Sequence, residues 1–232
     1  MECILECRGL TKIYDAFPVV NALNMTLPKG QIIGLLGPNG SGKTTFIKLA
    51  AGLLTPTAGQ ILIQGKEPGV ETKAVVSYLP ERPYFEGGLK VNEMLDYFAD
   101  FYADFDRVKA VEMLQHLGVD VSARLKTLSK GTKEKVQLVL VMARKAALYL
   151  LDEPIGGVDP ATRDYILQTI LTNYNSESTI LISTHLIFDI EKILDGFLFF
   201  AGGQVILQGA ADATRAQYGK SLDELFREVF RC

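Results

Sequence analysis

The sequence of 232 residues has no tryptophan, only three cysteines and two histidines, and no excess of positive charge. The cysteines Cys3, Cys7 and Cys232 fit neither a disulfide framework nor metal-ligand spacing, so we expect a reducing compartment. The 24 basic residues are set against 27 acidic ones, which gives a formal charge of -3. This balance predicts no broad basic surface for nucleic acid.

Long apolar runs are also missing. No stretch approaches the roughly 18 consecutive apolar residues that cross a bilayer. The first residues, Met1 and Glu2, offer neither the basic lead of a secretion signal nor the glycine of a myristoylation site. We therefore expect a soluble, cytoplasmic chain that reaches a membrane only through a partner protein.

What is present is an alternation of short β-type runs with amphipathic helical stretches, which is typical of a mainly parallel sheet covered by helices. Apolar residues make up 48% of the chain, enough for one core with a smaller lobe. Strands are expected near 4–8, 20–27, 31–36, 60–63, 75–79, 148–152, 179–183, 196–200 and 204–208. Helices are expected near 42–51, 91–102, 105–117, 133–146, 160–174 and 186–194.

The pattern predicts a single α/β domain. Between 80 and 126 the β-type runs give way to helical segments rich in aromatic and acidic residues. We interpret residues 1–79 and 127–209 as the core, 80–126 as an inserted helical lobe and 210–232 as a short helical tail. No repeat or long linker predicts a second domain.

A glycine-rich turn between the strand at 31–36 and the following helix has the phosphate-loop pattern, Gly37, Pro38, Asn39, Gly40, Ser41, Gly42, Lys43 and Thr44. Glycines allow the backbone N–H groups to point inward, and the helix presents its positive end to an anion. We expect Lys43 to neutralise phosphate oxygens and the Thr44 hydroxyl to take one position on Mg²⁺. Thr45 is grouped with the nucleotide-binding residues.

The apolar strand at 148–152 ends in two adjacent carboxylates, Asp152 and Glu153. Open α/β sheets bind ligands at the carboxyl ends of their strands. We expect Asp152 to assist Mg²⁺ binding and Glu153 to act as a general base on water.

Residues 128–132 read Leu-Ser-Lys-Gly-Thr and precede the paired carboxylates by some twenty residues. This segment resembles the signature loop of ATP-binding-cassette (ABC) proteins, and the resemblance extends over nearly the whole chain. It implies a P-loop NTPase fold whose core has a mainly parallel sheet and an N-terminal antiparallel β subdomain. It also implies ATP contacts for a set of residues outside the phosphate loop, namely Tyr14 (at adenine), Glu81, Leu128, Ser129, Lys130, Gly131 and Asp159.

The resemblance further implies that His185 is a catalytic switch histidine contacting the γ-phosphate. Two departures from the family pattern stand out. Glu81 replaces a customary glutamine, and we expect it to keep a metal-linked role. Lys130 replaces a glycine, which is more similar to subunits of drug, peptide or antibiotic exporters than to importers.

The resemblance implies a homo- or heterodimer of ATPase subunits that binds ATP and Mg²⁺ and powers a membrane permease, on the inner face of the cell membrane. Apolar residues such as Tyr84, Phe85 and Leu89 fit either a docking groove for that permease or an ordinary small core. Three alternatives share the nucleotide motifs: a soluble ABC ATPase such as an iron–sulfur assembly factor, a small-molecule kinase, and a non-catalytic nucleotide-binding regulator.

Overall fold

The computed structural model describes residues 2–83, 85 and 88–230. Tyr84 and Cys232, which figured in the sequence analysis, lie outside these described residues. Within the described residues, no helix combines the length and apolar character needed to cross a membrane.

The larger sheet has six strands in the order β5-β6-β7-β3-β8-β9, and all neighbours are parallel except β8 and β9. Its three central strands are buried at every position, which explains their nearly continuous apolar runs. The strands are β3 (Ile32–Leu36), β5 (Val76–Leu79), β6 (Leu148–Asp152), β7 (Thr179–Thr184), β8 (Gly196–Ala201) and β9 (Gln204–Ala210).

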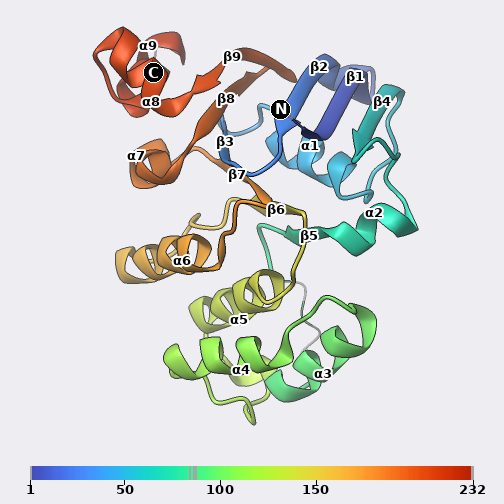
Figure 1. Cartoon of the computed structure of the whole chain (residues 1–232), viewed down its shortest axis with the longest axis vertical. Helices are drawn as coiled ribbons and strands as arrows, with labels where there is room; N and C mark the ends of the chain where they lie inside the picture. The colour runs from blue at the N-terminus through green and yellow to red at the C-terminus, as the bar shows by residue number, and fades with distance from the viewer. Residues whose placement is uncertain (1, 84, 86–87, 231–232) are drawn as a thin grey trace.

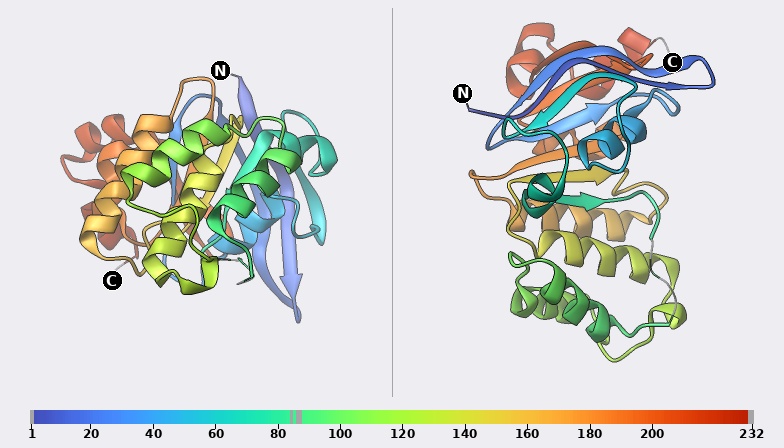
Figure 2. Two further views of the ribbon diagram at one scale, coloured as in Figure 1. Left: turned by 90° about the horizontal axis from the view of Figure 1, so that it is seen from below. Right: turned by 90° about the vertical axis from the view of Figure 1, so that its right-hand side faces the viewer.

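A second, antiparallel sheet has the order β2-β1-β4 and is built from β1 (Cys3–Tyr14), β2 (Phe17–Pro28) and β4 (Ala58–Ile63). Helix α1 (Lys43–Ala50) lies between this sheet and the six-stranded one, as the right-hand view of Figure 2 shows. Its residues Phe46, Ile47 and Leu49 are fully buried in the core between the two sheets.

Most of the other helices cover the opposite face of the large sheet or extend beyond it, and the first of them lies beside β5 near the end of α1. They are α2 (Val70–Val75), α3 (Val91–Phe101), α4 (Arg107–His116), α5 (Lys130–Met142), α6 (Pro160–Asn173), α7 (Ile187–Ile190), α8 (Ala211–Tyr218) and α9 (Leu222–Phe230), with 3-10 turns at Leu125–Thr127 and Glu191–Ile193. Helices α3 and α4 lie at the end of the molecule opposite the β1–β2–β4 sheet (Figure 1). They share an apolar core with α5, which connects them to the rest of the molecule.

The order of the elements agrees with the sequence analysis, and the predicted α/β fold with an antiparallel N-terminal sheet is confirmed, but several boundaries differ. Strands β1 and β2 are longer than expected because they form a continuous hairpin whose turn residues Asp15 and Ala16 adopt positive φ. Helix α2 was not expected. Helix α5 begins three residues earlier, since the Ser129 hydroxyl accepts a hydrogen bond from Thr132 N and caps it there.

The helix expected at 186–194 is a four-residue helix followed by a 3-10 turn. Asp195, just beyond this segment, is bound to the start of β3. Its N–H donates to Ile32 O (2.9 Å), and its carboxylate accepts from Ile32 N (2.8 Å). The chain is therefore fixed beside the start of β3.

Arg144, just after α5, ties the α3–α4 region to the sheet. Its guanidinium donates to the carbonyl oxygens of Val76 (2.6 Å) and Ala74 (2.7 Å), and its Nε lies 2.9 Å from an Asp104 carboxylate oxygen. The ring of Tyr102 lies 3.8 Å from the guanidinium carbon. The Arg144 side chain is 3% exposed, so these contacts operate in a poorly solvated site.

We expect Arg144→Ala to lower the free energy of unfolding by about 3 kcal/mol or more, because it leaves Asp104 and two carbonyl groups without their charged partner. Urea denaturation measures the change. Arg8→Ala is the matched control, since Arg8 pairs with Glu6 in an exposed position where such pairs contribute less than about 1 kcal/mol. Equal effects of the two substitutions would show that the buried contacts add nothing.

Candidate active site

Three glycines determine the shape of the turn between β3 and α1, two within the turn and one that packs against it. Gly42 has φ 104°, and a Cβ there would lie 2.4 Å from Val19 O. Gly40 has φ 80° with open space around it. Gly203, in the β8–β9 turn, donates its N–H to Ser41 O (3.2 Å), and a Cβ on it would lie 2.6 Å from Val19 O. The phosphate loop is thus held from two sides by backbone contacts.

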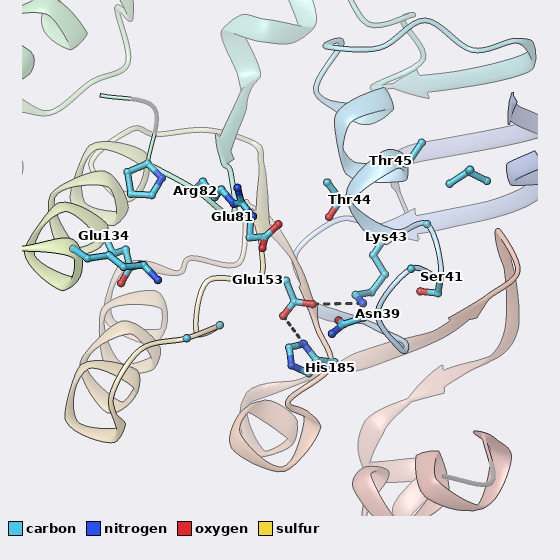
Figure 3. Close-up of a pocket in the computed structure, with 17 residues that line it drawn as sticks. Asn39, Ser41, Lys43, Thr44, Thr45, Glu81, Arg82, Glu134, Glu153 and His185 are labelled. Carbon is cyan, nitrogen blue, oxygen red and sulfur yellow. Dashed lines mark hydrogen bonds and ion pairs between the residues drawn. The ribbon is translucent and has the colours of Figure 1, made fainter. Parts of the chain in front are cut away.

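Lys43 begins α1 and is 5% exposed. Its ammonium group donates to Gly37 O (2.8 Å) and Pro38 O (3.2 Å), which curl the turn around it. It also lies 3.4 Å from a Glu153 carboxylate oxygen, as Figure 3 shows. A cation is therefore fixed at the floor of the turn.

Asp152 is the last residue of β6 and is 1% exposed. One carboxylate oxygen accepts from Ser183 Oγ (2.7 Å) and Thr44 Oγ1 (3.1 Å). The other oxygen is buried and has no hydrogen-bond partner in the part of the chain that the structure describes. Burial raises the pKa of Asp152, and the two hydroxyl hydrogen bonds oppose that shift.

An acceptor-only oxygen left without a partner beside a threonine hydroxyl fits a divalent cation that prefers oxygen ligands. Among the described residues, no cluster of three or more His, Cys, Asp or Glu side chains could hold a metal ion by itself. A cation here would therefore depend on oxygens of a ligand as well as on Thr44 and Asp152.

Glu153 follows in the left-handed backbone region, with φ 48°, which is uncommon for a residue with a side chain. Its N–H donates to Ser183 O (3.0 Å) and Ser183 Oγ (3.1 Å), and its carbonyl accepts from Gly156 N (3.0 Å). This turn directs the carboxylate between Lys43 and His185, whose Nδ1 lies 3.1 Å from Glu153 Oε2 (Figure 3).

Ser183 was named in the sequence analysis only as part of a strand, yet it contacts both carboxylate residues. It lies in β7, which pairs in parallel register with β6 so that Ser183 stands beside Asp152. The sequence signal was a serine at the end of the apolar run at 179–183.

A cavity of about 800 Å³ lies between the phosphate loop and α5. It brings together many of the predicted site residues, namely Asn39, Gly40, Ser41, Gly42, Lys43, Thr44, Thr45, Glu81, Lys130, Glu153 and His185. The sequence analysis did not foresee the remaining lining residues, Val19, Arg82, Pro83, Glu134, Gly156 and Gly157.

Among the described residues, the other predicted site residues do not line this cavity, namely Tyr14, Gly37, Pro38, Leu128, Ser129, Gly131, Asp152 and Asp159. Ser129 caps α5, and Asp159 caps α6 by accepting from Thr162 N (3.0 Å) and Thr162 Oγ1 (2.7 Å). Tyr14 is 42% exposed, and the Lys12 ammonium lies 5.3 Å from its ring centre.

Two α5 side chains reach the cavity from the side facing the phosphate loop. Lys130 lies 3.8 Å from Glu134, and burial raises the pKa of Glu134 against the opposing charge of Lys130. Gln137, one turn further along α5, donates to Pro80 O (3.0 Å) and so connects α5 to the segment that contains Glu81.

The fold and the cavity define a phosphate-loop nucleotide-binding protein with a carboxylate pair at the carboxyl end of β6. The comparisons narrow this class. A sequence model described as ABC transporter matches residues 20–156. The chain therefore belongs to the ABC transporter family of ATP-binding subunits, which are ATPases.

Individual relatives agree. The ABC transporter ATP-binding protein YtrB of Bacillus subtilis (strain 168) is 35% identical over 84% of this chain and 68% of its own. The ABC-type transporter ATP-binding protein EcsA of the same organism is 30% identical over 97% of this chain and 96% of its own. A solved structure of the ATP-binding subunit of an ABC transporter superposes with a TM-score of 0.87 at 32% identity, covering 98% of this chain and 99% of that one.

Because the carboxylate of Asp152 is buried, we expect the thermal stability of the chain to depend on pH. The raised pKa means that the folded chain holds this proton up to a higher pH than the unfolded chain, where aspartate titrates near about 4. Ionised Asp152 therefore destabilises the ligand-free fold at neutral pH, and the penalty fades as the pH falls toward 4. We expect Asp152→Asn to raise Tm by about 2–4 °C at pH 7.5 and to lose that advantage at lower pH.

Asp164→Asn is the control, because Asp164 is exposed on α6. It should leave Tm unchanged throughout. A lower Tm for Asp152→Asn at every pH would contradict the electrostatic argument.

Proposed function

We propose that this chain is the ATP-hydrolysing subunit that powers transport by a separate membrane permease, and that the transport is export of a drug, peptide or antibiotic. The observation that carries the ATPase mechanism is the contact of Glu153 with both Lys43 and His185 beside a buried, half-satisfied Asp152.

Each residue then has a separate task. The amide groups of residues 37–44 and Lys43 hold the triphosphate, with the α1 N-terminus contributing positive potential. Glu153 accepts a proton from the attacking water, and His185 contacts the γ-phosphate and holds the Glu153 carboxylate in place. Thr44 and Asp152, with Glu81 nearby, would hold Mg²⁺, which would neutralise phosphate charge there.

The Lys43 ammonium lies 3.4 Å from a Glu153 carboxylate oxygen. We infer that the triphosphate takes over this cation, because phosphate oxygens carry more charge than a single carboxylate. When ATP binds, Glu153 loses its contact with Lys43, and its carboxylate becomes available to the attacking water. Binding and activation of the base are in this way parts of one exchange.

The site needs a second subunit. Ser129 and Asp159 cap helices and do not line the cavity of their own chain. We propose that two ATPase subunits face each other head to tail, so that the Ser129 loop and the α5 N-terminus of one meet the γ-phosphate held by the other. Tyr14, Leu128, Lys130 and Gly131 complete the nucleotide contacts in that arrangement.

We further propose that residues 80–126 form a lobe that transmits motion to the permease, and that the core at 1–79 and 127–209 with the tail at 210–232 binds nucleotide. This arrangement places the subunit in the cytoplasm, on the inner face of the cell membrane. Export is supported by relatives whose names describe multidrug and lantibiotic transport, YbhF of Escherichia coli (strain K12) and SrtF of Streptococcus pyogenes. They are 31% and 29% identical to this chain.

Glu153→Gln tests the assignment of the base. The amide keeps the size of the side chain and removes its ability to accept a proton, so we expect ATP turnover to fall by about 100-fold or more while ATP still binds. A nucleotide-bound dimer should accumulate on size-exclusion chromatography. Glu67→Gln, on an exposed turn, is the matched control. Normal turnover in Glu153→Gln would reject the assignment.

Purification of the tagged chain from detergent-solubilised membranes tests the transport role. We expect a multispanning membrane protein to copurify, and mass spectrometry identifies it. A soluble partner instead would favour the alternative of an assembly factor, such as one serving iron–sulfur centres. A phosphorylated metabolite formed with little free phosphate would favour a kinase, and ATP binding without turnover would favour a regulator.

A further inference from the structure

Two segments that flank the carboxylate pair are each followed directly by a helix. The loop containing Gly156 and Gly157 leads through Asp159 into α6, and His185 leads into α7. The two helices contact each other through residues that are 26 positions apart in the sequence. The Arg163 side chain makes a polar connection between them.

Arg163 lies in the first turn of α6. Its Nη1 donates to Asp189 Oδ2 on α7 at 2.6 Å, and its Nη2 lies 3.5 Å from the carbonyl oxygen of Val158. Its Nε is buried and has no hydrogen-bond partner among residues 2–83, 85 and 88–230. Both side chains of the ion pair are about one-quarter exposed, so solvent screens the pair only in part.

The contact closes a ring of structure around the active site. From Glu153 the chain runs through a turn to Val158 and α6, across the Arg163–Asp189 pair to α7, back to His185, and from its ring nitrogen to Glu153 again. The two closing contacts are the 2.6 Å ion pair and the 3.1 Å contact between His185 and Glu153.

Buried side chains hold the segments of this ring in place, so a displacement of one segment can be transmitted to the next. Ile155 and Val158 anchor the turn in the core, and Ile187 and Ile190 anchor α7 in the same core. Helix α7 has only four residues, which is too short to hold its direction without side-chain contacts. The pair with Arg163 supplies a lateral hold on it, four residues after His185.

We propose that Arg163 is a positioning residue that couples the loop carrying Asp159 to His185. The proposal rests on the proposed function, in which Asp159 meets the second subunit. Docking of that subunit fixes the loop and the first turn of α6, and the guanidinium passes this constraint to α7 through Asp189. The contact of His185 with Glu153 is present in the single chain, and dimer closure holds this histidine in the orientation that meets the γ-phosphate.

The test compares Arg163→Ala and Asp189→Asn with the wild-type dimer in steady-state ATPase assays. We expect kcat to fall about 10-fold, because a small displacement of an orienting group costs that much or more. The ATP concentration at half-maximal rate should change less than 2-fold, since neither residue touches the phosphate loop, and the Hill coefficient should fall toward 1.

Two further measurements separate positioning from simple stability. In a His185→Ala background, Arg163→Ala should produce no additional loss of the residual rate, because its effect passes through that histidine. The charge exchange Arg163→Asp with Asp189→Arg should recover most of kcat. Arg107→Ala is the matched control, since Arg107 also joins two helices by pairing with Asp96 (2.8 Å) but lies in the α3–α4 region.

An equal loss in the wild-type and His185→Ala backgrounds, or unchanged kcat and Hill coefficient in both single variants, would overturn the proposal. An equal loss of kcat in Arg107→Ala would also overturn it. Failure of the proposed function looks different, because the wild-type chain itself would then show no cooperative ATP turnover.

Discussion

The two adjacent carboxylates at the end of β6 are the constraint around which the site is organised. Asp152 ends a strand that is buried at every position, so its charge is poorly solvated. The hydroxyls of Ser183 and Thr44 compensate one of its oxygens, while Glu153 is turned away by an unfavourable backbone angle and finds Lys43 and His185. These hydroxyl, ammonium and imidazole groups stabilise two carboxylates that are adjacent in the chain.

This organisation explains why local sequence patterns carried so much of the interpretation. The phosphate loop and the carboxylate pair each occupy one continuous segment, where residue type and spacing express the chemistry directly. The order of strands and helices followed from runs of apolar residues that the large sheet buries on both faces. Ser129 and Asp159 were singled out through the family resemblance, and the structure shows that both cap helices.

Contacts between distant segments could not be foreseen. Ser183 meets Asp152 only because β6 and β7 pair in a particular register. The Arg163–Asp189 pair joins two helices whose contacting residues are 26 residues apart in the sequence. Lys130 faces the cavity of its own chain because α5 begins at that residue, a boundary that the periodicity of the helix placed three residues too late.

The contact of Gly203 with the phosphate loop bears on how this scaffold can vary. A short turn between antiparallel strands is ordinarily a place where a chain accepts extra residues or an inserted tag. Here the turn after β8 is pressed against Val19 and Ser41, with no space for even one methyl group. Additional residues in this hairpin turn would displace the phosphate loop. Insertions in this scaffold are therefore expected in other surface turns and not in this one.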